Sequence, residues 1–84
     1  MELRSRFEEA VAKSKLLTNR PSNEILLQLY SLFKQATEGD NQQDPPSNPF
    51  DFVAKAKHDA WSQLKGKAAE DCMQEYISLI DSLQ

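Results

Sequence analysis

Tyr30 and Lys34 lie four residues apart in the segment Leu29–Asp40, LYSLFKQATEGD. On a helix, residues at this spacing project from one face, so an aromatic hydroxyl and an ammonium would lie together. Such a pair suits a phosphorylated ligand that also carries a flat base. A third candidate, Lys57, stands beside aromatic residues in the segment Lys55–Trp61, KAKHDAW. Each of these residues also has an ordinary explanation: the lysines as solvated surface side chains, and the tyrosine as a side chain at the edge of the core. Spacing within one helix does not show that residues of two helices form a shared site.

The overall charge of the chain limits its partners. The net charge is −3 at neutral pH, so nothing attracts nucleic acid to the protein as a whole, and we expect no nucleic-acid partner. An anionic ligand must therefore be held by a local group of cations.

The residue types that catalysis needs are scarce. His58 is the single histidine, and its neighbour Asp59 would face another way on a helix, so the two do not form an acid–base pair. The single cysteine, Cys72, falls on an apolar stripe, where thiols usually only pack. The two glycines, Gly39 and Gly66, do not form a phosphate-binding loop. We expect a binding protein and not an enzyme, with no metal and no cofactor.

Helical periodicity predicts four helices and no strand. Ser22 and Asp51 are the expected N-caps of two helices, and Gly39 the expected C-cap of one. The expected helices span about 3–17, 22–37, 52–64 and 68–83, with a long loop from 38 to 49. The predicted core faces are Leu3, Phe7, Ala10, Val11 and Ser14; Ile25, Leu29, Leu32, Phe33 and Ala36; Val53, Ala56, Ala60 and Leu64; and Ala69, Cys72, Met73, Tyr76, Ile77, Ile80 and Leu83. These features indicate an all-α fold, a small four-helix bundle in one domain over residues 1–84.

The location of the protein is also an expectation from the sequence. Charged residues interrupt the N-terminal segment, and no apolar run approaches the length of a membrane span. With one cysteine, no disulfide can form within the chain. We expect a monomeric cytoplasmic protein without stable membrane insertion.

Several short strings occur in an order that resembles the acyl-CoA-binding protein family. They are LYSLFKQATEGD, then Phe50-Asp51-Phe52, then KAKHDAW followed by Leu64-Lys65-Gly66, and finally Tyr76-Ile77. The resemblance extends over nearly the whole chain, from Phe7 to about Leu83. The resemblance implies an up-down-down-up bundle with a long loop between the second and third helices. It also implies a long-chain fatty acyl-CoA ligand, bound one to one.

The resemblance assigns roles to individual residues. Tyr30 matches a tyrosine that packs against adenine and reaches phosphate, Lys34 a lysine that pairs with the phosphate on the ribose, and Lys57 a lysine beside the nucleotide phosphates. Tyr76 matches a tyrosine lining the same site, and Lys15 a lysine at its rim. Further implied ligand-binding positions are Val11, Leu26 and Leu27, near the adenine or along the acyl groove, and Phe33.

The chain departs from the family pattern in three places. Phe33 stands where many members have a second tyrosine, which removes one hydroxyl. His58 replaces the tryptophan usual at its position, which removes aromatic packing. The segment Asp44–Pro49 differs from the family loop and borders the expected groove, so it bears on the preference for chain length.

The function implied by the resemblance is non-catalytic binding, buffering and transport of medium- to long-chain acyl-CoA inside the cell. We expect transient contact with the enzymes that use this ligand. The alternative is a helical protein-interaction module that binds an amphipathic helix, because Leu26, Leu27 and Leu32 supply more apolar surface than a bundle needs. An acyl-CoA transferase or thioesterase would need a base or nucleophile that the sequence does not supply.

Overall fold

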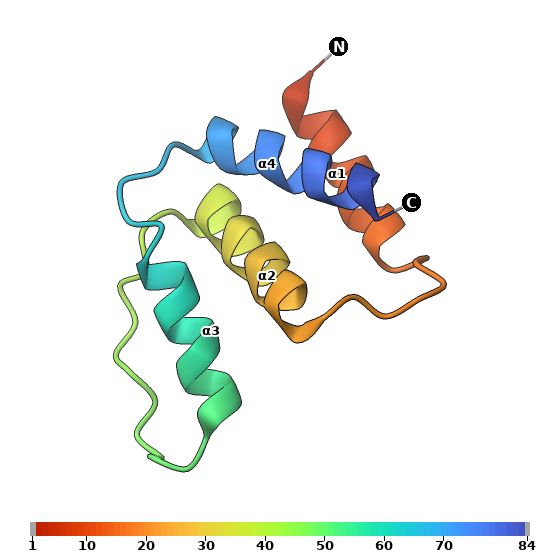
Figure 1. Ribbon diagram of the computed structural model, residues 1–84. Helices are drawn as coiled ribbons and strands as arrows, with labels where there is room; N and C mark the ends of the chain where they lie inside the picture. Colours follow the sequence, from red (N-terminus) through yellow and green to blue (C-terminus); the bar gives the residue numbers. More distant parts are fainter. Residues whose placement is uncertain (1, 84) are drawn as a thin grey trace.

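The computed structural model describes residues 2–83, which form four α-helices and no strand (Figure 1). The helices are α1 (Leu3–Ser14), α2 (Asn23–Glu38), α3 (Phe52–Ser62) and α4 (Ala69–Ser82). The prediction of an all-α bundle is therefore confirmed. No helix in this part of the chain has both the length and the apolar character needed to cross a membrane.

Local capping explains where α2 and α3 begin and where α2 ends. The hydroxyl of Ser22 accepts a hydrogen bond from the amide of Ile25 at 3.3 Å, and the carboxylate of Asp51 accepts one from the amide of Ala54 at 3.0 Å. Gly39 closes α2 with a φ of +80°, a conformation that favours glycine. All three predicted caps are confirmed.

Two predicted helix ends were wrong by two or three residues. α1 stops at Ser14 and not at Leu17, and α3 stops at Ser62 and not at Leu64. In both places the backbone continues as a tighter turn, with amide-to-carbonyl bonds from Leu16 to Lys13 and from Leu64 to Trp61. Helix ends that tighten in this way leave the apolar spacing intact, so periodicity alone places the boundary too late.

The helices are arranged in the expected up-down-down-up order. In Figure 1, α2 and α3 both run from the bottom of the view toward the top, whereas α1 runs downward. α4 packs against α1 and α2, while α3 packs against α2 alone among the helices of residues 2–83. The molecule is consequently flat, with extents of 41 × 29 × 15 Å. One side of α3 is left without a helix opposite it.

The core lies where α1, α2 and α4 meet. Cys72 and Ile80 of α4 are fully buried, and the edge of the Tyr76 ring meets Phe7 with their centres 5.1 Å apart. Burial raises the pKa of the Cys72 thiol, which keeps it protonated and unreactive at neutral pH. The predicted packing role of Cys72 is confirmed. The buried core residues are Phe7, Ala10, Leu29, Leu32, Ala36, Cys72, Met73, Tyr76, Ile77 and Ile80.

Two residues predicted to lie in the core do not. Phe33 is 36% exposed and Val53 is 66% exposed. Both border open hollows: Val53 lines a groove between α2 and α3, and Phe33 lines a hollow beside Tyr30 and Tyr76. The prediction was wrong because apolar spacing identifies an apolar stripe but not what lies against it.

The loop between α2 and α3 is attached to the bundle along its first residues. The buried side chain of Gln35 and the amide of Gly66 each donate to one carboxylate oxygen of Asp40 at 2.8 Å. The indole of Trp61 donates to the carbonyl of Gly39, also at 2.8 Å. The bond from Gly66, followed by that from Gln35, lowers the pKa of Asp40. The loop is thus an ordered crossing.

Candidate ligand-binding site

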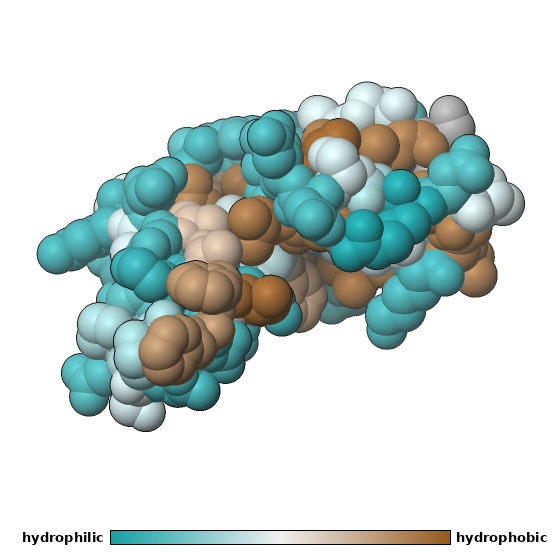
Figure 2. All heavy atoms as spheres, turned by 60° about the horizontal axis from the view of Figure 1, so that its bottom comes forward, coloured by the Kyte–Doolittle hydropathy of each residue, from teal (hydrophilic) through white to brown (hydrophobic). Residues whose placement is uncertain are grey.

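A groove of about 650 Å³ lies between the N-terminal halves of α2 and α3. Its walls are mainly apolar, because α3 presents Val53 and Ala56 to Leu26 and Leu27 of α2. Figure 2 brings this face of the molecule forward and shows apolar atoms gathered across it among hydrophilic ones. The residues lining the groove are Arg20, Asn23, Leu26, Leu27, Tyr30, Phe52, Val53, Ala56 and Lys57.

One end of the groove carries a cation held beside an aromatic ring. The ammonium of Lys57 lies 5.3 Å from the centre of the Tyr30 ring, within the range of a cation–π contact. The ion pairs among residues 2–83 give Lys57 no carboxylate partner. Its charge therefore remains available to an anion that enters the groove.

Lys34 lies one turn after Tyr30 but is already paired. Its ammonium is 2.6 Å from a carboxylate oxygen of Glu38 and 5.3 Å from the centre of the Trp61 ring. The bond to Glu38 raises the pKa of Lys34, so the lysine is charged at every physiological pH. A phosphate reaching Lys34 would compete with Glu38 for the same ammonium.

A second hollow, of about 230 Å³, is bordered by three aromatic rings. Tyr30, Phe33 and Tyr76 all line it, and the exposed face of Phe33 is supported from behind by the ring of Phe7, 6.0 Å away in a stacked arrangement. Aromatic faces of this kind suit a flat ring as a ligand. The remaining lining comes from Ser14, Leu17, Pro21, Leu26 and Leu29.

A third hollow, of about 290 Å³, lies under the loop between α2 and α3. Tyr30, Lys57 and Trp61 border it on the helical side, and loop residues close the other side. Tyr30 therefore lies at the junction of all three hollows. The other lining residues are Asn41, Gln43, Asp44, Pro46, Ala54 and His58.

The structure brings most of the residues singled out from the sequence to this one face. Six of them line the hollows described above: Leu26, Leu27, Tyr30, Phe33, Lys57 and Tyr76. Lys34 reaches the site through its contact with Trp61. Two others lie elsewhere: Val11 packs against the core, and Lys15, the exposed C-cap of α1, borders none of these three hollows.

Sequence reasoning missed other residues of the site. Arg20 lines the groove and donates to the side chain of Asn23 at 3.1 Å, which places a second cation at the start of α2. It was missed because a loop residue has no helical periodicity. Phe52 and Trp61 were noticed only as parts of short strings, although Phe52 is a wall of the groove and Trp61 supports Lys34.

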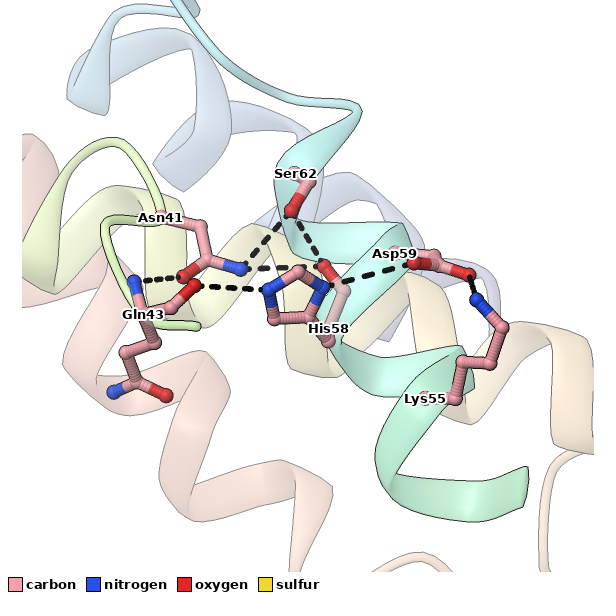
Figure 3. Close-up of polar contacts among 6 residues, drawn as sticks. All are labelled: Asn41, Gln43, Lys55, His58, Asp59 and Ser62. Carbon is pink, nitrogen blue, oxygen red and sulfur yellow. Dashed lines mark hydrogen bonds and ion pairs between the residues drawn. The ribbon is translucent and has the colours of Figure 1, made fainter. Parts of the chain in front are cut away.

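His58 is largely buried, with 17% of its side chain exposed. One ring nitrogen, Nε2, lies 3.0 Å from the carbonyl of Gln43, and the other, Nδ1, lies 3.6 Å from the carboxylate of Asp59 (Figure 3). The expectation that His58 and Asp59 face different ways was wrong, because both side chains bend toward each other from neighbouring positions. Among the described residues, no group of three or more His, Cys, Asp and Glu side chains could hold a metal ion.

Comparison with known proteins identifies the family. The family described as "Acyl CoA binding protein" matches residues 4–80. The chain is 47% identical over 77 residues to Acyl-CoA-binding protein homolog 1 of Caenorhabditis elegans, covering 92% of this chain and 88% of that protein. It is 48% identical over 77 residues to part of Enoyl-CoA delta isomerase 2 of Rattus norvegicus, covering 92% of this chain but 19% of that protein.

A solved structure gives the same answer for the fold. The crystal structure of Oryza sativa Acyl-CoA-Binding Protein 2 superposes with a TM-score of 0.90 at 39% identity, covering 98% of this chain and 90% of that one. Sequence and fold therefore agree over nearly the whole length of both chains. The chain belongs to the acyl-CoA-binding protein family.

Proposed function

We propose that this protein binds medium- to long-chain fatty acyl-CoA esters without acting on them, and buffers and carries them in the cytoplasm as a monomer. The observation that carries the proposal is the contact between Lys57 and Tyr30 at the end of an apolar groove. A cation beside an aromatic ring matches a nucleotide head, and the groove beyond it matches an acyl tail. The two parts of the ligand would then occupy adjoining hollows.

The head of the ligand would lie against the cations and aromatic rings. Coenzyme A carries a pyrophosphate and a ribose phosphate, and each charge-assisted bond to them contributes roughly 1.5–3 kcal/mol where water is partly excluded. We assign the nucleotide phosphates to Lys57, the ribose phosphate to Lys34, and the adenine to the hollow between Tyr30 and Tyr76. Lys15 and Val11 would contact only the rim of the bound ligand, since neither borders that hollow.

The tail of the ligand would lie between α2 and α3. Leu26 and Leu27 on one wall and Phe52 and Val53 on the other offer an apolar lining. Each methylene removed from water contributes about 0.8 kcal/mol, so eight added methylenes contribute at most about 6 kcal/mol. The observed gain should be smaller, because the tail loses rotational freedom and the groove is finite.

The chemistry of the site supports carriage and not conversion of the ligand. The residues that border the three hollows include one histidine, His58, whose ring nitrogens lie near the carbonyl of Gln43 and the carboxylate of Asp59. Cys72 is fully buried in the core and away from all three. A bound ester would be shielded from water and then released to the enzymes that use it.

Calorimetry on four compounds in one buffer tests the proposal. Palmitoyl-CoA should bind most tightly, octanoyl-CoA less tightly, free CoA weakly but detectably, and free palmitate worst of all. Added salt should weaken the contribution of the head and spare that of the tail. Palmitate binding as tightly as palmitoyl-CoA would contradict the nucleotide-head site. Absence of binding to all four compounds would favour a helix-binding module instead.

A further inference from the structure

The groove between α2 and α3 differs in charge from the protein as a whole. The chain carries a net charge of −3, yet the residues that line the groove include two cations, Arg20 and Lys57, and no carboxylate. Neither cation has an ion-pair partner among residues 2–83. The groove therefore combines apolar walls with positive charge alone, which suits a ligand that is both apolar and anionic.

The two cations lie at opposite ends of the groove. The guanidinium of Arg20 donates to the side chain of Asn23, the first residue of α2, at 3.1 Å. The ammonium of Lys57 lies beside the ring of Tyr30. Tyr30 follows Asn23 by two helical turns, which is roughly 10 Å along α2. Because α2 and α3 run in the same direction, the first turns of both helices lie at the Arg20 end (Figure 1).

Arg20 keeps most of its hydrogen-bonding capacity. A guanidinium carries several N–H donors in a planar fork that matches the two oxygens of a carboxylate. Within residues 2–83, the side chain of Arg20 donates to Asn23 alone. Asn23 thus holds the cation at the groove and leaves its other donors free. The apolar stem of an arginine can also lie along a methyl-ended tail while the charge stays in water, so an ordinary acyl chain is still accepted.

We propose that the groove also binds acyl-CoA esters whose tail ends in a carboxylate, the monothioesters of long dicarboxylic acids, and that Arg20 pairs with this terminal carboxylate. The inference rests on the proposed function, which assigns the nucleotide phosphates to Lys57 and the tail to the groove. A long tail then carries its carboxylate, which is ionised at neutral pH, to the start of α2. The ligand would have an anion at each end, as the groove has a cation at each end.

Calorimetry on two esters of equal length tests the pairing. Palmitoyl-CoA and hexadecanedioyl-CoA differ only at the last carbon of the tail, so the ratio of their affinities isolates the terminal carboxylate. The ratio of hexadecanedioyl-CoA to palmitoyl-CoA affinity should fall about threefold in Arg20→Gln, as expected for a pair with an exposed arginine. Palmitoyl-CoA affinity itself should change by less than about twofold. Equal ratios in Arg20→Gln and the parent protein would overturn the inference.

Two further variants separate the position of the charge from its sign. Arg20→Lys keeps a cation without the planar fork, so it should retain part of the preference for the carboxylate. Arg6→Gln is the matched control, because Arg6 is an exposed arginine of α1 that borders none of the three hollows. It removes the same charge and should leave the ratio unchanged. A fall in Arg6→Gln as large as that in Arg20→Gln would show an effect of net charge and overturn the pairing.

Short ligands test where along the groove Arg20 acts. The carboxylate of succinyl-CoA stays near the head of the ligand, so Arg20→Gln should leave the ratio of succinyl-CoA to butyryl-CoA affinity unchanged. The affinity for free CoA should also be unchanged. If Arg20→Gln weakened free CoA as much as hexadecanedioyl-CoA, Arg20 would contact the phosphates and the inference would be wrong.

The two long esters also distinguish failure of this inference from failure of the proposed function. A parent protein that binds palmitoyl-CoA but not hexadecanedioyl-CoA would overturn the inference and leave the proposed function intact. A parent protein that binds neither ester would overturn the proposed function, and the inference with it.

Discussion

The ammonium of Lys57 lies 5.3 Å from the centre of the Tyr30 ring, and both residues border the groove as well as the hollow beneath the loop. The two come from different helices, so their contact exists only in the folded chain. It places a positive charge where the apolar groove ends. The tyrosine therefore supplies a ring surface and a hydroxyl at the point where the head and tail of an amphiphile would meet.

Replacing Tyr30 separates these two contributions. Tyr30→Phe should weaken palmitoyl-CoA binding by about 0.5–1.5 kcal/mol, the usual net contribution of one hydrogen bond. Tyr30→Ala should cost more, because it also removes the ring contact and the surface next to Lys57. Calorimetry on both variants checks this order. If Phe and Ala proved equally damaging, the hydroxyl and not the ring would carry the contact.

Replacing Lys34 should affect binding far more than folding. Lys34→Ala should lose roughly 2–3 kcal/mol of palmitoyl-CoA affinity, as for a charge-assisted bond in a partly dry site. Its pair with Glu38 is a helical surface pair, so the free energy of unfolding should fall by only about 0.5 kcal/mol. Lys13→Ala is the matched control, an exposed lysine of α1 outside the three hollows. Unchanged affinity in Lys34→Ala would remove this lysine from the site.

Glu38 offers a complementary change, since it competes for the ammonium of Lys34 at 2.6 Å. Glu38→Gln should leave the lysine charged while removing the competing carboxylate. Palmitoyl-CoA affinity should then increase, and a decrease would mean that Glu38 orients Lys34 and does not compete with the ligand. Titration calorimetry beside the Lys34→Ala series gives the answer.

Cys72 should matter for stability alone. Cys72→Ser places a hydroxyl at a fully buried position, which costs about 1–3 kcal/mol if the group finds no partner. Cys72→Ala, which leaves no polar group, should be milder. Urea unfolding measures both, and palmitoyl-CoA affinity should be unchanged in either folded variant. Selective loss of binding in a stable variant would contradict the packing role.

Asp40 should make the stability of the protein sensitive to acid. Hydrogen bonds from Gly66 and Gln35 lower the pKa of Asp40 below its ordinary value of 3.8. A carboxyl whose pKa is lowered in the folded state stabilises the protein above the ordinary value, and this contribution is lost as pH falls through the folded-state pKa. Asp40→Asn keeps an oxygen for both donors but cannot titrate. Urea unfolding between about pH 5 and about pH 2 should show a steeper fall in the parent than in this variant.

Asp40→Ala extends the comparison. It removes the acceptor as well as the charge, so the amide of Gly66 and the side chain of Gln35 both lose a partner. Its stability at neutral pH should therefore be lower than that of Asp40→Asn. Parallel acid profiles for the parent and Asp40→Asn would mean that other carboxyls dominate the acid response.

Local patterns in the sequence were enough to predict the parts of the fold that depend on neighbours along the chain. Ser22, Asp51 and Gly39 each act on a backbone group within a few residues, so their roles could be read without knowing the fold. The apolar stripe of α4 was also predicted correctly, because both α1 and α2 pack against this helix. Val53 was not, since its exposure depends on α3 having a single neighbouring helix.

The candidate site was predictable only where several short strings resembled a known family. Tyr30 and Lys57 are 27 positions apart, and no periodicity relates them. The contact between Gln43 and His58 joins a loop carbonyl to a helix side chain, and a backbone carbonyl has no signature in a sequence. The positions of Arg20 and Phe52 on the groove also have no signature in the sequence. They follow from the path of the connection between α1 and α2 and of the loop between α2 and α3.

Trp61 is the single tryptophan of the sequence, with 3% of its surface exposed, its indole N–H bonded to Gly39 and the ammonium of Lys34 over its ring. Its emission spectrum is therefore an internal optical probe of this one junction. A phosphate that drew Lys34 away would change the electric field at the indole, and loosening of the loop would admit water to it. Ligand titration and unfolding could both be followed by fluorescence in the unlabelled protein, each with its own spectral shift.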